Sequence, residues 1–314
     1  MHLKHRAISQ LKILLLLTGI FLSSYGKGQL VPSKPASYPV FSPVLLNPGI
    51  AGSRDFADLN LLFRANNTPG AQMVSYHSRL MKSGSGSSFT PFGVGGYVYQ
   101  DHQVNSRTLS AGAMGAYHLS IGAGKSRGIS IGLAAKGMYT LITEDGESIP
   151  GAANTFVPNA DLGIYYYGPN AFAGITGMNL LSEFLGAESL AGGEVVIDRE
   201  QFFYGGLKLL LSRANEIVIE PSLVVNLSDS LTTAPLSNIR PYLKIYVQNA
   251  CFGATLRDLD HLAFFLQYQF PRFYSGVFIE LPRNEMLIRG NQYIIDLTLG
   301  MHLGSSDNKR SYRW

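Results

Sequence analysis

Histidine is the residue type that most often supports acid–base or metal chemistry near neutral pH. Five of the seven histidines lie beyond residue 28: His77, His102, His118, His261 and His302. None has the spacing of a motif such as HExxH, which places two imidazoles on one helix face. His77-Ser78 could belong to a lipid-active enzyme, but no supporting Asn–His–Ser arrangement accompanies the pair. We therefore expect no catalytic residues and no enzymatic activity.

Glycine-rich stretches are the next candidates, because such loops can hold phosphate groups. Gly93-x-Gly95-Gly96 is followed by further glycines at positions 112, 115, 122 and 124. No helix is expected after any of them, so they do not fit a phosphate-binding loop. Close approach of neighbouring strands explains these glycines better, and we expect no cofactor.

One aspartate, one acidic segment and a single cysteine complete the candidates for chemistry. Asp101 and Glu144-Asp145-Gly146-Glu147 could bind a divalent ion on an outer loop, but a solvated acidic loop is favoured. We therefore predict no metal site. Cys251 is the only cysteine, which excludes an intramolecular disulfide and a cysteine-based zinc site. No role is assigned to it.

The charge content separates this chain from most soluble proteins. Only 15% of its 314 residues are charged, against about 25% in an average soluble domain. The net charge of +4 comes from Lys4, Arg6, Lys12 and Lys27. Beyond residue 28, 21 basic residues balance 21 acidic residues. A neutral remainder does not predict nucleic-acid binding.

The first 28 residues have the pattern of an export signal. Residues 1–12 are basic, and the apolar run Ile13–Leu22 is interrupted only by Thr18 and Gly19. That run is shorter than the ~20 residues of a membrane-spanning helix. Gly26 and Gly28 have the spacing of a cleavage site. We predict a signal peptide over residues 1–28, with a buried N-terminal helix as the alternative and no membrane-spanning helix later in the chain.

From residue 57 onward, apolar and polar residues alternate with a period of two. In residues 129–141, Ile129, Ile131 and Leu133 share one parity, whereas Ser130 and Lys136 share the other. Successive side chains of a strand point to opposite faces. Ten charged residues fall on the polar parity: Lys136, Asp161, Lys208, Glu216, Glu220, Arg240, Lys244, Arg257, Glu280 and Asp296.

This charge distribution predicts an all-β fold, a transmembrane outer-membrane β-barrel. A Lys or Arg facing lipid at the bilayer centre would cost ~2–4 kcal/mol, so charges belong on the lumenal face. A soluble β-sandwich also alternates, but its outer face is rich in Lys and Glu. Here the polar face is mostly Gly, Ser, Tyr and Asn.

We predict about fourteen antiparallel strands, an even number as in closed bacterial barrels. They are centred on 57–63, 71–79, 92–100, 108–119, 128–141, 157–167, 171–179, 201–212, 216–227, 239–248, 250–256, 262–270, 273–281 and 293–303. The barrel therefore covers residues 57–303, after an N-terminal periplasmic or lumenal segment at 29–56. A polar tail follows at 304–314.

Connection lengths predict the orientation. The connections 142–156, 180–200, 228–238 and 282–292 are long, and 168–170, 213–215 and 271–272 are tight turns. Short turns in bacterial barrels face the periplasm and long loops face outward. Both termini are then periplasmic. The connections 80–91 and 120–127 would also be periplasmic, and they are exceptions to the rule because they are longer than tight turns. The connection 180–200, with a short helix expected at Ser182–Ala191, is the best candidate for an outer contact or lid.

A proline-rich segment precedes the first strand. Pro32, Pro35, Pro39, Pro43 and Pro48 disfavour regular structure over residues 31–52. Asn47-Pro48-Gly49 predicts a turn. The segment could fold into the lumen as a plug, dock on a periplasmic partner, or simply lead into the first strand.

This segment and the first strand resemble the PorP/SprF family of the Bacteroidetes type IX secretion system. The resembling residues are Phe41-Ser42-Pro43-Val44-Leu45-Leu46-Asn47-Pro48-Gly49-Ile50-Ala51-Gly52, Asp58–Arg64, Ser75-Tyr76, Leu266–Phe270, Tyr274–Gly276 and Ile295–Gly300. In that family an "F…LNPA.AG" stretch precedes a "YR.QW" strand. The chain departs from the pattern where Gly49 replaces alanine and where no aromatic residue follows Arg64, which puts a contact of that aromatic in doubt.

The resemblance implies a non-enzymatic barrel in the outer membrane of a Gram-negative, Bacteroidetes-like bacterium. Its implied partners are proteins of the secretion or gliding apparatus, either a periplasmic lipoprotein that binds peptidoglycan or a large surface adhesin. The candidate partner-binding residues are Phe41, Asn47, Pro48, Gly49, Ala51, Gly52 and Arg64. The alternative is a pore or transporter for small solutes, because about fourteen strands enclose a wide lumen. A lipid-active barrel enzyme would be a third class, but it lacks catalytic groups.

Overall fold

A computed structural model describes residues 37–54, 56–65, 70–81, 89–103, 106–121, 127–144, 147–148, 155–181, 199–227, 238–257, 261–282 and 293–303. The predicted signal peptide, the tail 304–314, Asp145 and the helix expected at Ser182–Ala191 lie outside these residues. Residues 82–88 of the connection 80–91 and residues 122–126 of the connection 120–127 also lie outside the described residues.

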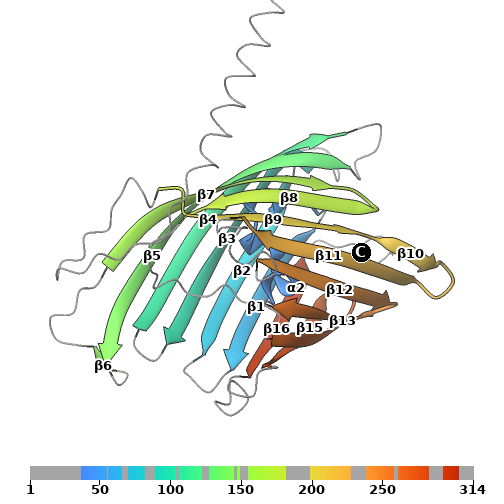
Figure 1. Cartoon of the computed structure of the whole chain (residues 1–314). Helices are drawn as coiled ribbons and strands as arrows, with labels where there is room; N and C mark the ends of the chain where they lie inside the picture. The colour runs from blue at the N-terminus through green and yellow to red at the C-terminus, as the bar shows by residue number, and fades with distance from the viewer. Residues whose placement is uncertain are drawn as a thin grey trace, which may run out of the picture.

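The described residues form a closed antiparallel barrel of fourteen strands (Figure 1). The strand segments are β1 (Ala57–Ala65), β2 (Ala71–Met81), β3 (Phe89–Gln103), β4 (Ser106–Ser120), β5 (Gly128–Glu144), β6 (Glu147–Ser148), β7 (Thr155–Tyr167), β8 (Ala171–Met178), β9 (Glu200–Leu207), β10 (Leu209–Ser212), β11 (Ile217–Asn226), β12 (Ile239–Val247), β13 (Ala250–Arg257), β14 (His261–Gln269), β15 (Phe273–Pro282) and β16 (Ile294–Leu303). β9 and β10 both pair with β11 and form one strand interrupted at Lys208, and β6 pairs only with the end of β5. The predicted fold class and strand number are confirmed.

Pairing of the first and last strands closes the barrel. β1 runs antiparallel to β16 from Ala57 opposite Leu303 to Ala65 opposite Ile295. In Figure 1 the blue strand β1 accordingly lies beside the red strand β16. This pairing joins the first and last strands of the described sheet, so neither of them presents an unpaired edge to lipid.

The tight turns lie together at one end of the barrel, which we call the short-turn end. They join β7 to β8, β10 to β11, β12 to β13 and β14 to β15. Glu216, expected at the start of a strand, instead lies in the turn 213–216 with a φ of 52°. Gln248 has the same φ in the next turn. Left-handed conformations of this kind reverse the chain within a few residues, which explains why the strand begins one residue later.

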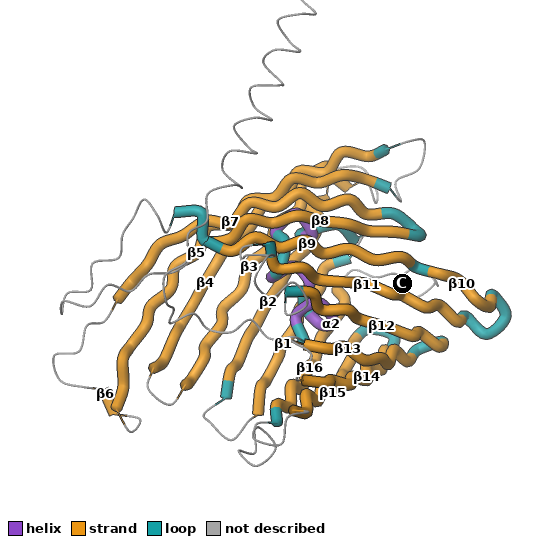
Figure 2. Tube along the Cα trace, viewed as in Figure 1, coloured by secondary structure: helices purple, strands orange, loops and turns teal. Residues whose placement is uncertain are grey.

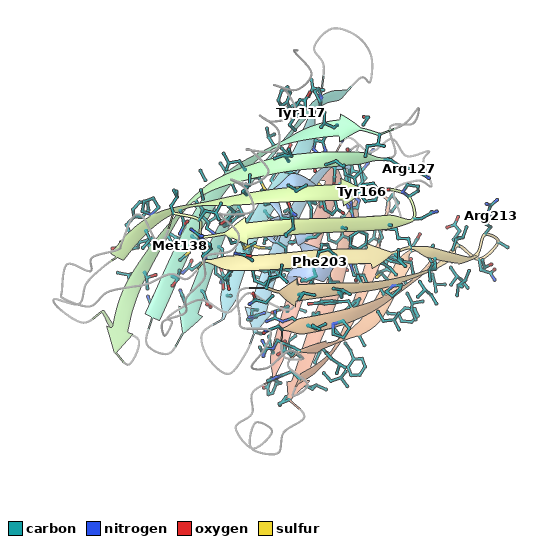
Figure 3. All side chains as sticks on the ribbon, turned by 45° about the horizontal axis from the view of Figure 1, so that its top comes forward. Tyr117, Arg127, Met138, Tyr166, Phe203 and Arg213 are labelled. Atoms are coloured by element: carbon teal, nitrogen blue, oxygen red, sulfur yellow. The ribbon has the colours of Figure 1, made fainter. Side chains whose placement is uncertain are left out.

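The two faces of the wall differ in polarity, as the alternation predicts. Along β16, Leu297, Leu299 and Met301 are exposed on the outside, whereas Asp296 and Thr298 are buried. Figure 3 shows the side chains along the wall, with Arg213 at the tip of a turn. The expected lumenal charges Asp161, Glu220, Lys244, Glu280 and Asp296 are all buried. Among the described residues, no helix is long and apolar enough to cross a membrane.

Ion pairs between strands neutralise these lumenal charges. Lys244 and Glu220 are register partners on β12 and β11 and approach to 2.9 Å. The Arg64 and Asp296 side chains, on β1 and β16, approach to 2.8 Å at the closing seam. Two further pairs have distances of 2.6 Å: Lys136–Asp161 joins the neighbouring strands β5 and β7, and Arg257–Glu280 reaches across β14 from β13 to β15. A shift of either strand by one residue would move one charge of each pair to the lipid face, so the pairs oppose register errors.

The outward face of β5 gives a direct test of this arrangement. Leu133 is 58% exposed and faces lipid, so Leu133→Arg should destabilise the barrel by about 2–4 kcal/mol. Met138 has the lumenal parity, opposite Val157, so Met138→Arg keeps its charge out of lipid. The measurement is the amount of folded, heat-modifiable barrel in outer-membrane fractions. Equal losses for the two variants would contradict the assignment of faces.

Candidate functional site

The segment before β1 occupies the lumen of the barrel. It contains three short helical turns, α2 (Tyr38–Phe41), η1 (Pro43–Leu45) and η2 (Pro48–Ile50). We call residues 37–54 the plug. Most of its side chains are buried, and η2 contacts β4, β5 and β7. Figure 2 shows the purple helical turns surrounded by strands.

Prolines and one asparagine determine the local shape of the plug. Pro43 and Pro48 each open a helical turn, a position where the missing N–H of proline costs nothing. Asn47 caps η2, because its side-chain oxygen accepts a hydrogen bond of 2.8 Å from the backbone N–H of Gly49. The turn predicted at Asn47–Gly49 is therefore a capped helical turn.

Asn47 also joins the plug to the wall. Its amide nitrogen donates to the backbone oxygens of Ile164, at 3.0 Å, and Ile175, at 3.2 Å. These two residues are opposite each other on β7 and β8. The Asn47 side chain is 1% exposed, so both ends of its amide are satisfied without water.

Glycines in the wall let the backbone of the plug lie directly on the strands. A Cβ atom at Gly132 on β5 would lie 2.3 Å from the Gly49 nitrogen, and one at Gly163 on β7 would lie 2.1 Å from Asn47 Oδ1. A Cβ at Gly174 on β8 would lie 2.6 Å from Asn47 Nδ2. Any larger residue would push the plug away from the wall. Sequence reasoning did not find this cradle, and the only available signal was the lumenal parity of Gly132.

A second contact of this kind lies near the end of the plug. Gly52 has a φ of +72°, and a Cβ at Gly93 on β3 would lie 2.0 Å from the Ala51 oxygen. Arg79 donates from Nε to the Gly52 oxygen at 2.8 Å. The close approach expected for the glycines near residue 93 is therefore made with the plug as well as between strands.

His118 holds the plug by a hydrogen bond to its backbone. Its Nε2 lies 2.8 Å from the backbone oxygen of Ala51. A carbonyl oxygen can only accept a hydrogen bond, so Nε2 carries the proton and donates. In the neutral imidazole Nδ1 then accepts from the Tyr167 hydroxyl at 3.2 Å. That hydroxyl in turn accepts from Arg79 at 2.9 Å. The network joins β2, β4 and β7 to one carbonyl of the plug.

The beginning of the plug is held on the opposite side of the barrel. Ser37 donates to Asp296 Oδ2 at 2.5 Å, and Arg64 contacts both oxygens of the same carboxylate. The Pro39 oxygen accepts from Lys244 at 3.2 Å. Burial raises the pKa of the Tyr38 phenol well above its ordinary value, so this hydroxyl stays neutral. The plug is thus fixed to strands around the whole lumen.

The candidate partner-binding residues are all engaged with the barrel. Asn47 and Gly49 are bound as described above, and Phe41 packs edge-on against Phe278 at 6.5 Å. Pro48, Ala51 and Gly52 are buried in the plug, and Arg64 is the ion-pair partner of Asp296. Binding of another protein through these residues stays a prediction.

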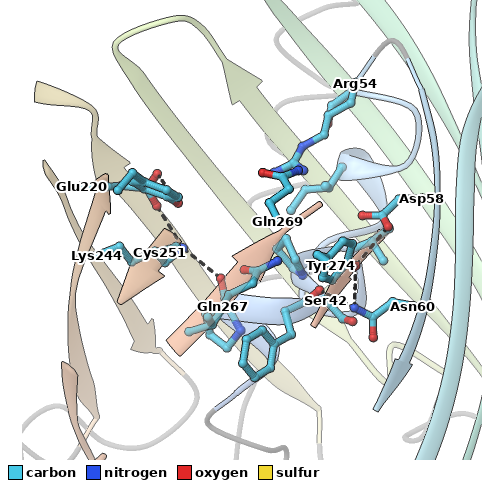
Figure 4. Close-up of a pocket in the computed structure, with 18 of the residues that line it drawn as sticks. Ser42, Arg54, Asp58, Asn60, Glu220, Lys244, Cys251, Gln267, Gln269 and Tyr274 are labelled. Atoms are coloured by element: carbon cyan, nitrogen blue, oxygen red, sulfur yellow. Dashed lines mark hydrogen bonds and ion pairs between the residues drawn. The ribbon is translucent and has the colours of Figure 1, made fainter. Parts of the chain in front are cut away.

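A polar cavity of about 120 Å³ lies between the plug and the strands near the short-turn end (Figure 4). Its lining includes Arg54, Asp58, Lys208, Glu220 and Lys244. His77, His302 and Cys251 also line it, which places three of the chemical candidates in one chamber. Among the described residues, no three His, Cys, Asp or Glu side chains are grouped as a metal site would require.

Two substitutions test the role of Asn47 in holding the plug. Asn47→Ala removes two donated hydrogen bonds and should cost about 1–3 kcal/mol of stability, because buried carbonyl groups lose a partner. Asn47→Asp should cost more, since it places an acceptor against two carbonyl oxygens. Guanidinium unfolding of the purified protein in detergent measures both. Asn170 is exposed in a tight turn, and the same substitutions there should have little effect; equal effects at the two positions would contradict the assignment.

Comparison with known proteins agrees with this architecture. The family model described as "Type IX secretion system membrane protein PorP/SprF" matches residues 36–300. No curated protein sequence compared with the chain matches it. Similar solved structures include the KdgM porin (8% identity, TM-score 0.37, 79% of this chain and 99% of that one) and CdiB from Acinetobacter baumannii (8%, 0.39, 79% and 60%). Another is the P. putida toluene transporter TodX (10%, 0.39, 79% and 86%). Likenesses this distant carry no functional argument, whereas the family match spans the plug and nearly all of the barrel. The chain belongs to the PorP/SprF family of type IX secretion system membrane proteins, and it is an outer-membrane β-barrel.

Proposed function

We propose that this barrel is a non-enzymatic anchor, which binds protein partners of the type IX secretion and gliding apparatus. The partner would be a periplasmic component or a secreted surface protein. The observation that supports this role is the plug, which is hydrogen-bonded to the wall on several sides. A barrel whose lumen is filled by its own chain suits attachment better than solute passage.

The orientation is part of this proposal. The short-turn end would face the periplasm, after removal of the signal peptide at 1–28. β1 begins and β16 ends at this end. The polar tail 304–314 would then continue from Leu303 on the periplasmic side, where a periplasmic component could contact both the tail and the short turns.

Association with partners is the first test. The tagged protein is purified in mild detergent from its native outer membrane, and bound proteins are identified by mass spectrometry. We expect type IX secretion components or one large surface protein at stoichiometric amounts. Recovery of the barrel alone, under conditions that keep other outer-membrane complexes intact, would contradict the anchor role.

Conductance tests the alternative of a solute pore. In planar bilayers the intact protein should show no persistent open state, because the plug fills the lumen. Gly132→Ala places a methyl group against the plug backbone and should increase conductance. Gly115→Ala is the control, since a Cβ there has its nearest neighbour at 3.9 Å.

Each conductance outcome has a clear meaning. A large open conductance of the intact protein would favour the pore over the anchor. If Gly132→Ala folds poorly, Asn47→Asp provides a second way of loosening the plug. Unchanged conductance in both folded variants would mean that the plug does not close the lumen.

A further inference from the structure

The cavity near the short-turn end contains more positive than negative charge. Two of its charges neutralise each other, because Lys244 and Glu220 form an ion pair at 2.9 Å. Asp58 accepts a hydrogen bond from the Tyr274 hydroxyl at 3.0 Å and lies 3.9 Å from His77. Arg54 and Lys208 add two positive charges to the one negative charge of Asp58, which leaves one positive charge in excess. Neither forms an ion pair within the part of the chain that the structure describes.

Arg54 is the cation that the plug contributes to this cavity. Its guanidinium lies over the Phe56 ring at 5.6 Å. It lines the cavity together with Asp58 on β1, His77 on β2 and Lys208 at the break between β9 and β10. The Arg54 side chain is exposed to solvent, and Figure 4 shows it pointing into the pocket. A small anion inside the cavity would therefore be attracted by both cations.

Two neutral polar groups of the lining also lack partners. Ser42 Oγ and His77 Nδ1 are buried without a hydrogen bond to any described residue, in side chains that are 3% and 7% exposed. A buried polar group without a partner destabilises the protein, so a ligand that pairs with it is favoured. Both line the cavity that contains Arg54 and Lys208. Ser42 Oγ can donate a hydrogen bond to an anionic oxygen, and His77 Nδ1 can do so in the neutral tautomer that carries its proton on Nδ1.

We propose that this cavity binds a carboxylate group, held between Arg54 and Lys208 with Ser42 and His77 as hydrogen-bond donors. The planar guanidinium of arginine matches the two oxygens of a carboxylate. A volume of about 120 Å³ accommodates a carboxylate with a short carbon chain and not a folded element. The exposed residues Arg54 and Gln248 form its accessible rim.

The carboxylate could come from a free dicarboxylate or from an acidic side chain of a bound protein, and the chemistry is the same. The second source rests on the proposed anchoring function. The charge of the cavity can be measured without any partner, so failure of this proposal is distinguishable from failure of the anchor role.

Charge-selective labelling of a cysteine measures the cavity directly. Cys251→Ala removes the only native thiol, and Gln248→Cys introduces one at the rim. The rates of an anionic sulfonatoethyl and a cationic trimethylammonioethyl methanethiosulfonate are compared and normalised to Asn215→Cys, on a turn outside the cavity. We expect the anionic reagent to be favoured by roughly fivefold or more, as one unpaired charge at short range predicts.

Removal of one cation should abolish most of this preference. Lys208→Met and, as a second variant, Arg54→Met should reduce the ratio toward one, whereas Arg213→Met on the turn 213–216 should not. Heat-modifiable migration in gels verifies that each variant is folded. A ratio near one in the parent protein, or a ratio unchanged in both folded cavity variants, would overturn the proposal.

Ligand protection then identifies the source. Succinate and the blocked peptide acetyl-Gly-Asp-Gly-amide are each tested for slowing the labelling of Gln248→Cys, with neutral succinamide as the control. Protection by succinate supports a free dicarboxylate, and protection by the peptide alone supports an acidic side chain of a partner. Protection by neither, or equal protection by succinamide, would show that no carboxylate site exists.

Discussion

The polar lumen depends on one constraint: a barrel that is filled rather than open must satisfy its interior polar groups with its own chain. Buried charges and amides cost several kcal/mol when they lack partners. Here ion pairs between adjacent strands neutralise the charges of the wall, and the plug supplies many of the remaining partners. The plug is therefore part of the core of the protein. It also explains how a sequence with few charged residues can place nearly all of its strand charges inside.

The strands were predictable because their signal is local. Lipid on one side and a polar lumen on the other impose a period of two on every strand, and this period located all fourteen strands within a few residues. Glu216 was assigned to a strand because its parity fits, but its left-handed backbone belongs to a turn. The break at Lys208 between β9 and β10 was not predicted either, although the run Leu209–Leu211 after it does not alternate.

The plug could not be derived from local patterns. Its short turns have no periodicity, and their positions are fixed by contacts with residues distant in the sequence, such as Asn47 with Ile164 and Ile175. The same is true of the glycine cradle. Gly132 looks like an ordinary small lumenal residue until the backbone of Gly49 is placed against it. His118 shows that a histidine without a recognisable motif can have a specific structural role, here the binding of a single carbonyl group.

These contacts explain the structural role of the residues that carry the family resemblance. Asn47 to Gly52 form the part of the plug that docks on β3, β4, β5, β7 and β8. Gly49 stands where the family has alanine. A Cβ atom added at Gly49 would lie 2.9 Å from Asn47 Oδ1 and 3.2 Å from Tyr165 Cβ, so glycine avoids a tight contact in this chain. A protein that reached these residues from outside would have to displace the plug from its glycines.

The order of the plug in the chain has a consequence for folding. The plug is synthesised before every strand, yet Ser37 contacts Asp296, 259 residues later, and Lys244 reaches back 205 residues to Pro39. Contacts of such high sequence separation form late, because the entropy of closing the intervening loop must be overcome first. The plug therefore gains its full set of partners only when the last strand arrives. Pairing of β16 with β1 completes the sheet around the plug, so a segment that is synthesised before every strand completes its native contacts only with the last one.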